Sequence, residues 1–392
     1  MSKSKAQSIC FIKAGNVVQS LRGLLKSPPE YHYTLSSFLK AIDNTYDIYL
    51  ISSKGPTGFI KHKNIQAVNI GLCLKFIPCR IERKTYTPIK TFIYLIRNIP
   101  NIVVANGNLT KSLPAFLYTA LFRKDLILSF HGDLFNRKHN IMSKIAYKFV
   151  IKYANSIIVH GPYIKEQVSN YRKKIERIYE YNHDCSDLIN YGNDNLTTDL
   201  TENGKYKLIT YIGRIEKDKG VFDIFEAYKL ILVNNKDIRL VFAGAGSSMN
   251  ELKEECRKKN LDDKVLFLGR ITRKEIALLL KITYVVVAAT RKNLAEGRCQ
   301  SIVEALAMGV PIIVPNYGAF LHLVEHKKNG LNFIGDDSSD LYHKLKMILN
   351  DSLYDRLKSG AINSSEKYIE SYPYSYKTAI IKSIDGLKSS IK

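Results

Sequence analysis

The stretch that decides the fold runs from Ala288 to Pro315 and reads AATRKNLAEGRCQSIVEALAMGVPIIVP. The residues just before and at its start, 282–288, are β-branched and apolar, which is typical of a buried parallel strand. Residues 291–299 are polar and predict a loop, residues 300–308 predict a short helix, and residues 310–314 predict the next strand. The order strand, loop, helix and strand is the repeating unit of a doubly wound α/β domain.

Two carboxylates in this stretch, Glu296 and Glu304, stand eight positions apart. Ligands of such a unit gather at the carboxyl ends of the strands, where the next helix offers free backbone N–H groups and a positive dipole end. A phosphate there would meet the N–H groups of Gln300 and Ser301. Carboxylates beside it would accept hydrogen bonds from sugar or ribose hydroxyls that flank a diphosphate. The alternative is an ordinary strand–helix turn with a solvated glutamate on each side.

A second loop of interest, GRIEKDKG, spans Gly213–Gly220, follows a predicted strand and opens a helix. Gly213 lets the backbone turn, while Arg214 and Lys219 project a forked donor and a point charge that suit the two ends of a diphosphate. Either cation alone is more simply part of a solvated basic turn. No Asp-x-Asp ends a strand in the first half, so we expect no metal, with the two cations serving instead.

Length and cysteine usage bound the class of protein. A chain of 392 residues suggests two domains. Its six cysteines are scattered without Cys-x-x-Cys spacing, which argues for a reducing compartment and against a disulfide framework or zinc site. No apolar run approaches the roughly 18 residues that span a bilayer, and the N-terminus lacks the apolar core of a signal peptide. We therefore expect a cytoplasmic protein.

The positive charge is concentrated in the first half of the chain. The whole chain carries +23, and residues 1–177 hold 28 Lys and Arg against 8 Asp and Glu, which leaves +20 there and +3 in the remainder. Such asymmetry implies an anionic partner, for which nucleic acid, a membrane surface and a polyanionic acceptor are candidates. The sequence shows no reader helix, RNP-like strand or aromatic platform, so we do not expect nucleic acid.

Alternation of strands and helices runs through both halves. The first half predicts strands at 8–14, 46–52, 65–70, 102–105, 126–130, 156–159 and 175–179, and helices at 35–42, 88–97, 114–122, 140–153 and 165–171. In the second half, strands are predicted at 206–212, 238–243 and 265–268. Before the quoted stretch, helices are predicted at 221–234, between 246 and about 259, and from about 273 onward. After it, two more helices are predicted within 336–350 and 352–370. Residues 15–34, 55–63 and 182–204 are predicted to be irregular.

This rhythm predicts an α/β protein with two doubly wound, Rossmann-like domains and a cleft between them. We expect the first domain at residues 1–200 and the second at 201–370. Residues 371–392 are expected to be a tail that packs back on the first domain.

The segment at residues 296–311, which reads EGRCQSIVEALAMGVP, resembles the E-x7-E segment of retaining GT-B glycosyltransferases of the family 4 type, also called glycosyl transferases group 1. GRIEKDKG matches the G-R-x-x-x-x-K-G signature of the same family. The resemblance is sharp from about residue 206 to 336 and rests on strand rhythm before that. It implies the GT-B fold and retaining transfer of a hexose from a UDP- or GDP-sugar to a glycan or lipid-linked acceptor, without a cofactor or metal. Surface polysaccharide synthesis would be the setting.

The family's site residues map onto this chain one by one. By resemblance, Arg214 and Lys219 neutralise the departing diphosphate, Glu304 holds the ribose, and Glu296 orients the sugar hydroxyls. His131, at the end of a predicted strand, would contact the donor sugar, although a lone histidine is more often a core or capping residue. The remaining predicted donor contacts are Gly15, Gly244, Ile271, Gly297, Gln300 and Ser301. The alternatives are a non-catalytic GT-B-like scaffold and a basic nucleic-acid-binding protein.

One predicted helix of the first half, at residues 140–153, is basic and amphipathic. Lys144, Lys148 and Lys152 repeat at every fourth position beside an apolar stripe of Ile141, Ile145 and Phe149. Such a helix can lie on an anionic membrane, where lipid-linked glycans are assembled. It can equally pack its apolar stripe on the sheet and leave its lysines in water. The charge of the whole first half favours peripheral association with the inner face of the cytoplasmic membrane.

Overall fold

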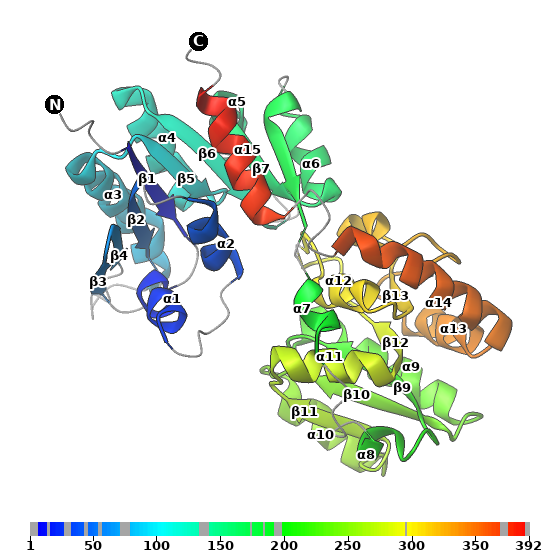
Figure 1. Cartoon of the computed structure of the whole chain (residues 1–392). Helices are drawn as coiled ribbons and strands as arrows, with labels where there is room; N and C mark the ends of the chain where they lie inside the picture. The colour runs from blue at the N-terminus through cyan, green and yellow to red at the C-terminus, as the bar shows by residue number, and fades with distance from the viewer. Residues whose placement is uncertain are drawn as a thin grey trace. The chain divides into compact units, whose positions relative to one another are not determined.

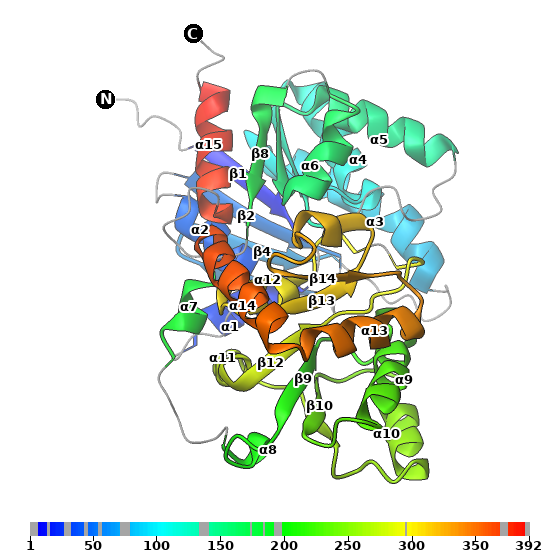
Figure 2. The same ribbon diagram turned by 90° about the vertical axis from the view of Figure 1, so that its right-hand side faces the viewer.

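A computed structural model describes residues 7–13, 16–26, 33–42, 46–53, 57–70, 79–132, 141–172, 175–182, 185–191, 198–294, 296–368 and 375–388. The chain divides into two compact units: unit 1 is Met1–Asn182 with Tyr374–Lys392, and unit 2 is His183–Pro373. Helices cover both faces of the sheet in each unit (Figures 1 and 2). The predicted boundary was residue 200, whereas the chain enters unit 2 after Asn182, because α7 (Ser186–Ile189) packs on helices of unit 2.

Unit 1 alternates strands and helices around one sheet. Its elements are β1 (Gln7–Ile12), α1 (Val17–Leu24), α2 (Tyr33–Ala41), β2 (Tyr46–Ser52), β3 (Gly58–His62), β4 (Ile65–Asn69), α3 (Cys79–Asn98), β5 (Ile102–Asn106), α4 (Leu109–Phe122), β6 (Asp125–Phe130), α5 (Ile141–Tyr153), β7 (Ser156–His160), α6 (Pro162–Ser169), η1 (Ile175–Arg177), β8 (Ile178–Tyr181) and α15 (Tyr376–Lys388).

The sheet of unit 1 has the strand order β3-β4-β2-β1-β5-β6-β7-β8, and β3 and β4 form its antiparallel pair. Successive residues of β1 face opposite sides, as a strand buried on both faces requires. Ile9 and Phe11 pack with α1, α2 and α15, whereas Cys10 and Ile12 pack on the other face with α3, α4, α5 and α6. The sheet therefore divides the core of unit 1 into two layers.

The C-terminal helix α15 belongs to the first of these layers. It packs against α2, β7 and β8, and Ser383 lies 2.5 Å from Ser156 of β7, Oγ to Oγ. Figure 1 shows this red helix lying among the elements of unit 1. The chain thus returns to unit 1 after building unit 2.

Unit 2 repeats the architecture with a smaller sheet. Its elements after α7 are α8 (Thr198–Thr201), β9 (Lys207–Ile212), η3 (Lys217–Lys219), α9 (Val221–Leu232), β10 (Ile238–Ala243), α10 (Met249–Lys258), β11 (Val265–Gly269), α11 (Arg273–Ile282), β12 (Thr283–Val287), α12 (Gln300–Ala307), β13 (Ile312–Pro315), η4 (Gly318–His322), β14 (Gly330–Phe333), α13 (Ser338–Ile348), α14 (Asp351–Ser365) and η5 (Glu366–Tyr368).

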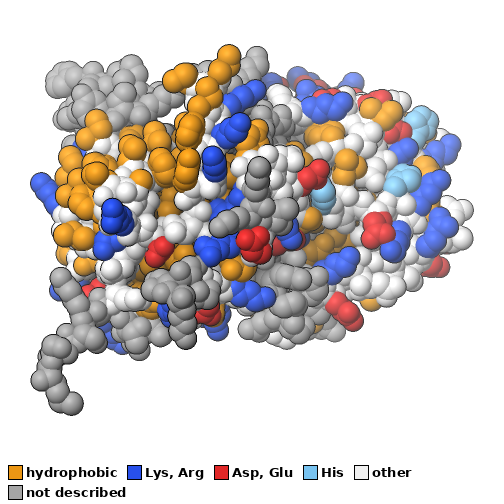
Figure 3. Space-filling model, turned by 90° about the horizontal axis from the view of Figure 1, so that it is seen from above, with side chains coloured by type: hydrophobic (Ala, Val, Ile, Leu, Met, Phe, Trp, Pro, Cys, Tyr) orange, Lys and Arg blue, Asp and Glu red, His pale blue; other side chains and the backbone are white. Residues whose placement is uncertain are grey.

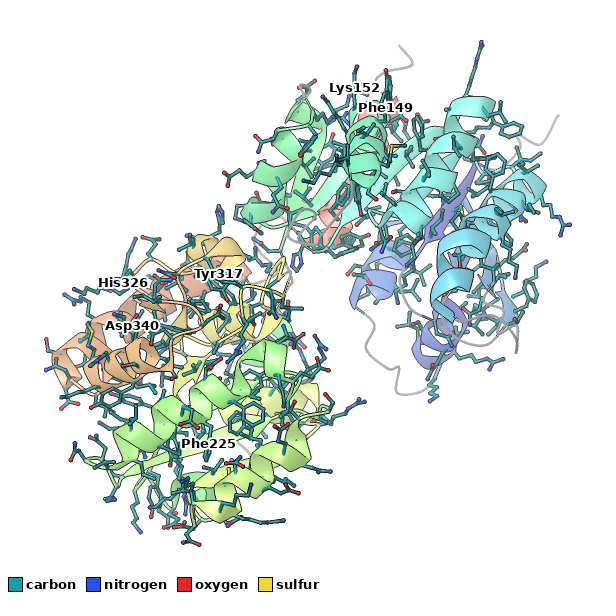
Figure 4. All side chains as sticks on the ribbon, turned by 180° about the vertical axis from the view of Figure 1, so that it is seen from behind. Phe149, Lys152, Phe225, Tyr317, His326 and Asp340 are labelled. Carbon is teal, nitrogen blue, oxygen red and sulfur yellow. The ribbon has the colours of Figure 1, made fainter. Side chains whose placement is uncertain are left out.

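The sheet of unit 2 is parallel throughout its described strands, in the order β11-β10-β9-β12-β13-β14. One face carries α9, α10, α13 and α14, with Phe225 of α9 fully buried against it, and the other carries α7, α11 and α12. Figure 4 shows Phe225 lying inside unit 2. Because both faces are covered, the strands are rich in Val and Ile rather than alternating.

Two predicted helix starts are wrong. Pro88 and Pro114 were expected to begin helices, but both lie inside longer ones, α3 and α4. The start of α4 is set by Asn108, whose side-chain oxygen accepts a hydrogen bond from the backbone N–H of Thr110 at 3.2 Å. An N-cap that satisfies these N–H groups fixes the helix start more strongly than a proline further along the chain.

Several short elements were not predicted. Helix α1 lies where an irregular connection was expected, and Asn16 caps it by accepting from the N–H of Gln19 at 2.9 Å. Strand β3 occupies part of the predicted loop 55–63, as the edge strand paired with β4. Strand β14, the single-turn helices α7 and α8, and the tail helix α15 were also missed. These elements carry too few residues, or too weak a period, to stand out in sequence.

Candidate functional site

The sheet of unit 2 reverses its direction of growth between β9 and β12. From β9 the chain proceeds to β10 and β11 on one side, and from β12 to β13 and β14 on the other. Loops leaving two such strands diverge, and ligands of doubly wound sheets bind in the crevice that results. A pocket of about 300 Å³ lies there, lined by Tyr211, Ile212, Gly213, Arg214, Lys219, Ala288, Thr290, Glu296, Arg298, Cys299, Gln300, Ser301 and Glu304.

The structure brings most of the predicted unit 2 site residues to this one pocket. Those that line it are Arg214, Lys219, Glu296, Gln300, Ser301 and Glu304. Gly297 is buried next to Glu296 in the chain but does not line the pocket. Gly15 lies outside the described residues.

The loop after β9 is shaped by its glycines and one tyrosine. Gly220 has φ +69°, and a Cβ there would lie 1.9 Å from the carbonyl oxygen of Ala289 in the loop after β12. Only glycine allows both that backbone conformation and that approach. Tyr211 supports the same loop by donating to the carbonyl oxygen of Arg214 at 2.6 Å. The two loops are therefore held against each other with Lys219 between them.

Lys219 and Glu296 form an ion pair across the pocket. The lysine ammonium donates to Oε2 of Glu296, and both side chains are mostly buried. Thr290 donates to the same carboxylate oxygen at 3.3 Å. Arg214 is more exposed and pairs with Glu216. Both predicted phosphate-binding cations thus rest on carboxylates in this structure.

The N-terminus of α12 forms one wall of the pocket. Its N-cap, Cys299, makes no side-chain hydrogen bond to the first-turn N–H groups, so the helix start carries no side-chain cap. Burial, and then the charge of Glu296, raises the pKa of Cys299 to about 11. The thiol therefore stays protonated near neutral pH and is not poised as a nucleophile.

Glu304 lies one turn into α12 and is held by Arg273 of α11. The guanidinium of Arg273 and the side-chain amide of Gln300, at 3.2 Å, both donate to Oε1 of Glu304. Arg273 also makes two bonds to Asp187 of α7, at 2.7 and 2.9 Å. Among the described residues no hydrogen bond to Oε2 of Glu304 is present, which leaves that oxygen for a ligand.

Charge balance explains this arrangement. Glu304 is only 5% exposed, and burial raises the pKa of its carboxyl while Arg273 opposes the rise. For Arg273, burial acts to lower the pKa, but Asp187 and Glu304 together raise it. A buried carboxylate needs such a partner to remain charged.

Two other predicted donor contacts lie elsewhere. A Cβ on Gly244 would lie 1.8 Å from the carbonyl oxygen of Gly213, so this glycine allows the loops after β9 and β10 to touch. Ile271 packs against the core on the far side of the sheet from α9. Neither residue lines the pocket, and the close backbone approach accounts for glycine at position 244 without a ligand.

Sequence reasoning missed several residues that shape the pocket. Tyr211, Thr290 and Arg298 line it, and Arg273 positions Glu304 from outside. Arg298 was within the quoted stretch, and its guanidinium lies 5.7 Å from the ring centroid of Tyr368. The position of Arg298, as a cation between the two glutamates, could have indicated that it lines the pocket. Nothing local in the sequence marks Arg273.

His131 follows β6 in unit 1, and both of its ring nitrogens meet hydroxyl groups of the same unit. Nε2 lies 3.1 Å from Oγ of Ser129, and Nδ1 contacts the hydroxyl of Tyr181. The hydroxyl of Tyr376 in α15 lies 3.2 Å from the same serine oxygen. Burial, followed by the charges of two nearby lysines, lowers the pKa of His131 to about 4. The imidazole is therefore neutral near pH 7, with a ring orientation set by two hydroxyl groups.

No metal site accompanies these residues in the part of the chain that the structure describes. Within those ranges no group of three or more His, Cys, Asp and Glu side chains is arranged to hold a metal ion.

Solved structures place the architecture in a known class. The structure of HepE from Anabaena in complex with UDP aligns with a TM-score of 0.70, at 14% identity, over 98% of this chain and 100% of that one. An identity this low shows the fold alone. The chain has the GT-B fold, an α/β fold of two Rossmann-like units, as the sequence predicts.

Sequence comparison supports the predicted resemblance. The family model described as Glycosyl transferases group 1 matches residues 192–364, which lie in unit 2, and the predicted resemblance to this family is confirmed over that part of the chain. The uncharacterized glycosyltransferase MJ1059 of Methanocaldococcus jannaschii is 25% identical over 295 residues, covering 71% of this chain and 70% of that protein.

A second relative covers less. The alpha-monoglucosyldiacylglycerol synthase of Streptococcus pneumoniae is 28% identical over 130 residues, which is 33% of this chain and 29% of that protein. The chain thus spans about a third or less of the length of some of the curated relatives that it matches.

Proposed function

We propose that the chain is a retaining glycosyltransferase that moves a hexose from a nucleotide-sugar to a glycan or lipid-linked acceptor. The observation that carries this proposal is the pocket of unit 2, where Arg214, Lys219, Glu296 and Glu304 meet the N-terminus of α12 at the reversal point of the sheet. Two cations, two carboxylates and a helix N-terminus match the diphosphate, ribose and sugar hydroxyls of such a donor.

In the proposed complex, the diphosphate pairs with the two cations that form ion pairs with carboxylates in this structure. Lys219 exchanges its bond to Glu296, and Arg214 its bond to Glu216, for phosphate oxygens. The two cations and the N–H groups near Gln300 and Ser301 then neutralise the diphosphate as it departs, so we propose that no metal or other cofactor is required.

The carboxylates serve the hydroxyl groups of the donor. Glu304 offers Oε2 to the ribose while Arg273 and Gln300 keep Oε1. Glu296, released from Lys219, accepts from the sugar hydroxyls, and Gly297 beside it lies near the reacting centre. We also propose that His131 contacts the donor sugar, as the family resemblance predicts.

The chemistry needs a stabilised leaving group and an oxocarbenium-like centre. The thiol of Cys299 stays protonated and is not a poised nucleophile, and we assign both carboxylates of the pocket to hydroxyl groups of the donor. We therefore favour a mechanism in which the leaving phosphate helps to deprotonate the acceptor on the same face of the sugar, which retains the configuration.

Two similar proteins support the proposed donor and acceptor. HepE, which shares the fold, was solved with UDP and also with UDP-glucose, in keeping with our proposal of a nucleotide-sugar donor, a UDP- or GDP-sugar. The name of the pneumococcal relative denotes synthesis of a glucosylated diacylglycerol, which supports a lipid-linked acceptor. Surface polysaccharide synthesis on the inner face of the cytoplasmic membrane is the setting we propose.

A thermal-shift screen against UDP, GDP, ADP and their sugar conjugates tests this function. A ligand that binds the folded protein at about 100 times its Kd stabilises it by roughly 2.7 kcal/mol, or about 5–10 °C for a unit of this size. We expect one nucleotide to give such a rise, and Lys219→Ala and Glu304→Gln each to abolish most of it.

Lys217→Ala is the matched control. Lys217 lies in the same loop, is exposed and pairs with Glu251 outside the pocket, so this variant should keep the full shift. Absence of a response to every nucleotide, together with a salt-sensitive response to a short DNA duplex, would contradict the proposal and favour a basic nucleic-acid-binding protein.

A further inference from the structure

Unit 1 concentrates the exposed apolar side chains of the chain on three helices. Among the described residues, 13 of the 22 large hydrophobic side chains that are exposed lie on α3, α4 and α5 or directly after α3. Neighbouring helices of this set pack on each other, α3 on α4 and α4 on α5. We call this surface the three-helix face. Figure 3 shows apolar side chains crowded along one edge of the molecule, with Lys and Arg beside them.

Each helix contributes a stripe at every third or fourth position. Helix α4 exposes Leu113, Leu117 and Leu121, and α3 exposes Ile89 and Ile93. Three or four residues is the spacing that places side chains on one side of a helix. The helices that carry these stripes pack on their neighbours, and exposed apolar side chains that gather on adjacent helices mark an interaction site.

Helix α5 decides between the two alternatives left open by its sequence. Its apolar stripe does not pack on the sheet: Ile141 is 76% exposed and Phe149 is 51% exposed. The helix is anchored instead by Tyr147, Val150 and Ile151, which are buried. Figure 4 shows Phe149 and Lys152 on the outside of unit 1. The alternative in which the stripe builds the core is wrong.

The border of the face is basic. Lys144, Lys148 and Lys152 are all exposed and lie along α5 beside the stripe, and Nζ of Lys152 lies 5.1 Å from the ring centroid of Tyr153. Residues 1–177 carry a net charge of +20. A second copy of the chain would bring the same excess of positive charge to an interface, which disfavours self-association. An anionic lipid surface offers both the opposite charge and an apolar interior.

We infer that the three-helix face docks on an anionic lipid bilayer. The leucine and isoleucine stripes enter the boundary between headgroups and acyl chains, and the lysines of α5 contact the headgroup phosphates. The inference deepens the membrane setting of the proposed function but uses no residue of the pocket. No helix among the described residues has the length and apolar character to cross a bilayer.

Vesicle sedimentation tests the charge. The full chain should bind vesicles of phosphatidylglycerol and phosphatidylcholine in equal parts and should bind pure phosphatidylcholine much more weakly. Changing Lys144, Lys148 and Lys152 together to Glu should weaken binding to the anionic vesicles by about 100-fold or more, since each lysine near the surface contributes roughly a fivefold effect. The control changes three exposed lysines of unit 2 to Glu, namely Lys236, Lys259 and Lys346, and should bind as the wild type.

A tryptophan reporter tests insertion. The chain contains no Trp, so Leu121→Trp on α4 gives a single emitter on the three-helix face, and Val233→Trp, exposed in unit 2, is its control. Anionic vesicles should shift the emission of the first variant to the blue, and brominated lipid should quench it, without effect on the second. Leu117→Ser combined with Leu121→Ser should lower vesicle binding while the melting temperature and its nucleotide response stay unchanged.

Two results would overturn the inference. If the three-lysine variant sedimented with anionic vesicles as the wild type does, the lysines of α5 would not bind lipid headgroups. A blue shift of Leu121→Trp that follows protein concentration without lipid, with a dimer in sedimentation velocity, would assign the face to a second copy of the chain. Because nucleotide response is measured on the same proteins, a failure of the membrane inference and a failure of the donor site are distinguishable.

Discussion

At the scale of single residues, Arg273 is the cation that compensates the buried negative charge of Glu304. Its guanidinium bonds to Asp187 on one side and to Oε1 of Glu304 on the other. Removing one member of a buried ionic group leaves an uncompensated charge, which typically costs about 3–5 kcal/mol. The burial of Glu304 makes this case applicable here.

We expect Arg273→Ala to lower the free energy of unfolding by about 3–5 kcal/mol in a urea titration at pH 7.5. Arg257 is the control, because Nε of Arg257 lies 3.9 Å from Oδ1 of Asp262 in an ion pair that is exposed on both sides. The two side chains are 69% and 64% exposed, so Arg257→Ala should cost about 1 kcal/mol or less. Equal losses in the two variants would show that burial does not set the importance of Arg273.

The loss in Arg273→Ala should also depend on pH. Without the arginine, burial raises the pKa of Glu304 unopposed, so the folded protein keeps a proton that the unfolded chain has released. Such a group contributes stability that is complete below the unfolded pKa and is lost as pH rises through the folded pKa. The deficit should therefore be smaller at pH 5 than at pH 7.5, and adding Glu304→Gln should remove this pH dependence.

Gly220 and Gly269 allow backbone strain to be separated from crowding. They have nearly the same φ, +69° and +67°, but a Cβ on Gly220 would lie 1.9 Å from the carbonyl oxygen of Ala289, whereas nothing lies within 4 Å of one on Gly269. A side chain at such a φ costs about 1–2 kcal/mol. Crowding comes in addition at position 220 only.

We expect Gly269→Ala to lose about 1–2 kcal/mol of stability and to keep its thermal response to the nucleotide. Gly220→Ala should lose more and should respond weakly, because the added Cβ pushes the loop of Lys219 away from the loop after β12. Thermal melts with and without the nucleotide measure both effects. A normal nucleotide response in Gly220→Ala would mean that the two loops need not touch for donor binding.

Part of the pocket was predictable because a βα unit places the loops after its strands, and the start of the next helix, at one end of the sheet. Although Thr290 and Arg298 of the loop after β12 were missed, Arg214, Lys219, Glu296 and Glu304 were predicted to lie there. Arg273 was not, because its bonds to Asp187 and Glu304 span 86 and 31 positions and depend on how three helices pack. The sequence could not show either that Gly244 serves a contact between loops.

At the scale of elements, buried strands were the easiest to predict. The bounds of β2 and β10 match the prediction, since apolar β-branched runs between polar turns indicate strands directly. Helix starts were harder. Asn108 and Asn16 are N-cap residues that are visible in the sequence. The start of α4 was nevertheless predicted at Pro114, and α1 was not recognised.

Amphipathic helix α5 shows a further limit of sequence patterns. Periodicity predicts that one side is apolar, and the structure has apolar residues on two sides: Tyr147 and Val150 face the core while Ile145 and Phe149 face outward. Because α5 carries a buried apolar stripe, an exposed apolar stripe and a row of lysines, periodicity alone left its partner undecided. The exposed stripe is what the membrane inference uses.

At the scale of the whole molecule, the chain crosses between the units twice, near residues 182 and 373. Each unit has its own hydrophobic clusters, and α15 completes one in unit 1 with Tyr376, Ile380, Ile384 and Leu387, all buried. Burial of a large apolar side chain contributes about 1.5–3 kcal/mol. Four of them approach the 5–15 kcal/mol that holds a typical domain folded. Unit 1 therefore depends on a segment that follows unit 2 in the chain.

A chain that ends at Tyr368 tests this dependence. We expect unit 1 to lose its cooperative unfolding transition, while unit 2, which keeps its clusters and its pocket, retains a transition that the nucleotide shifts upward. Differential scanning calorimetry with and without nucleotide measures both. A chain that ends at Lys388 keeps α15 and should show both transitions. Loss of the nucleotide-sensitive transition in the shorter chain would show that unit 2 needs a folded unit 1, because its own core is untouched by the truncation.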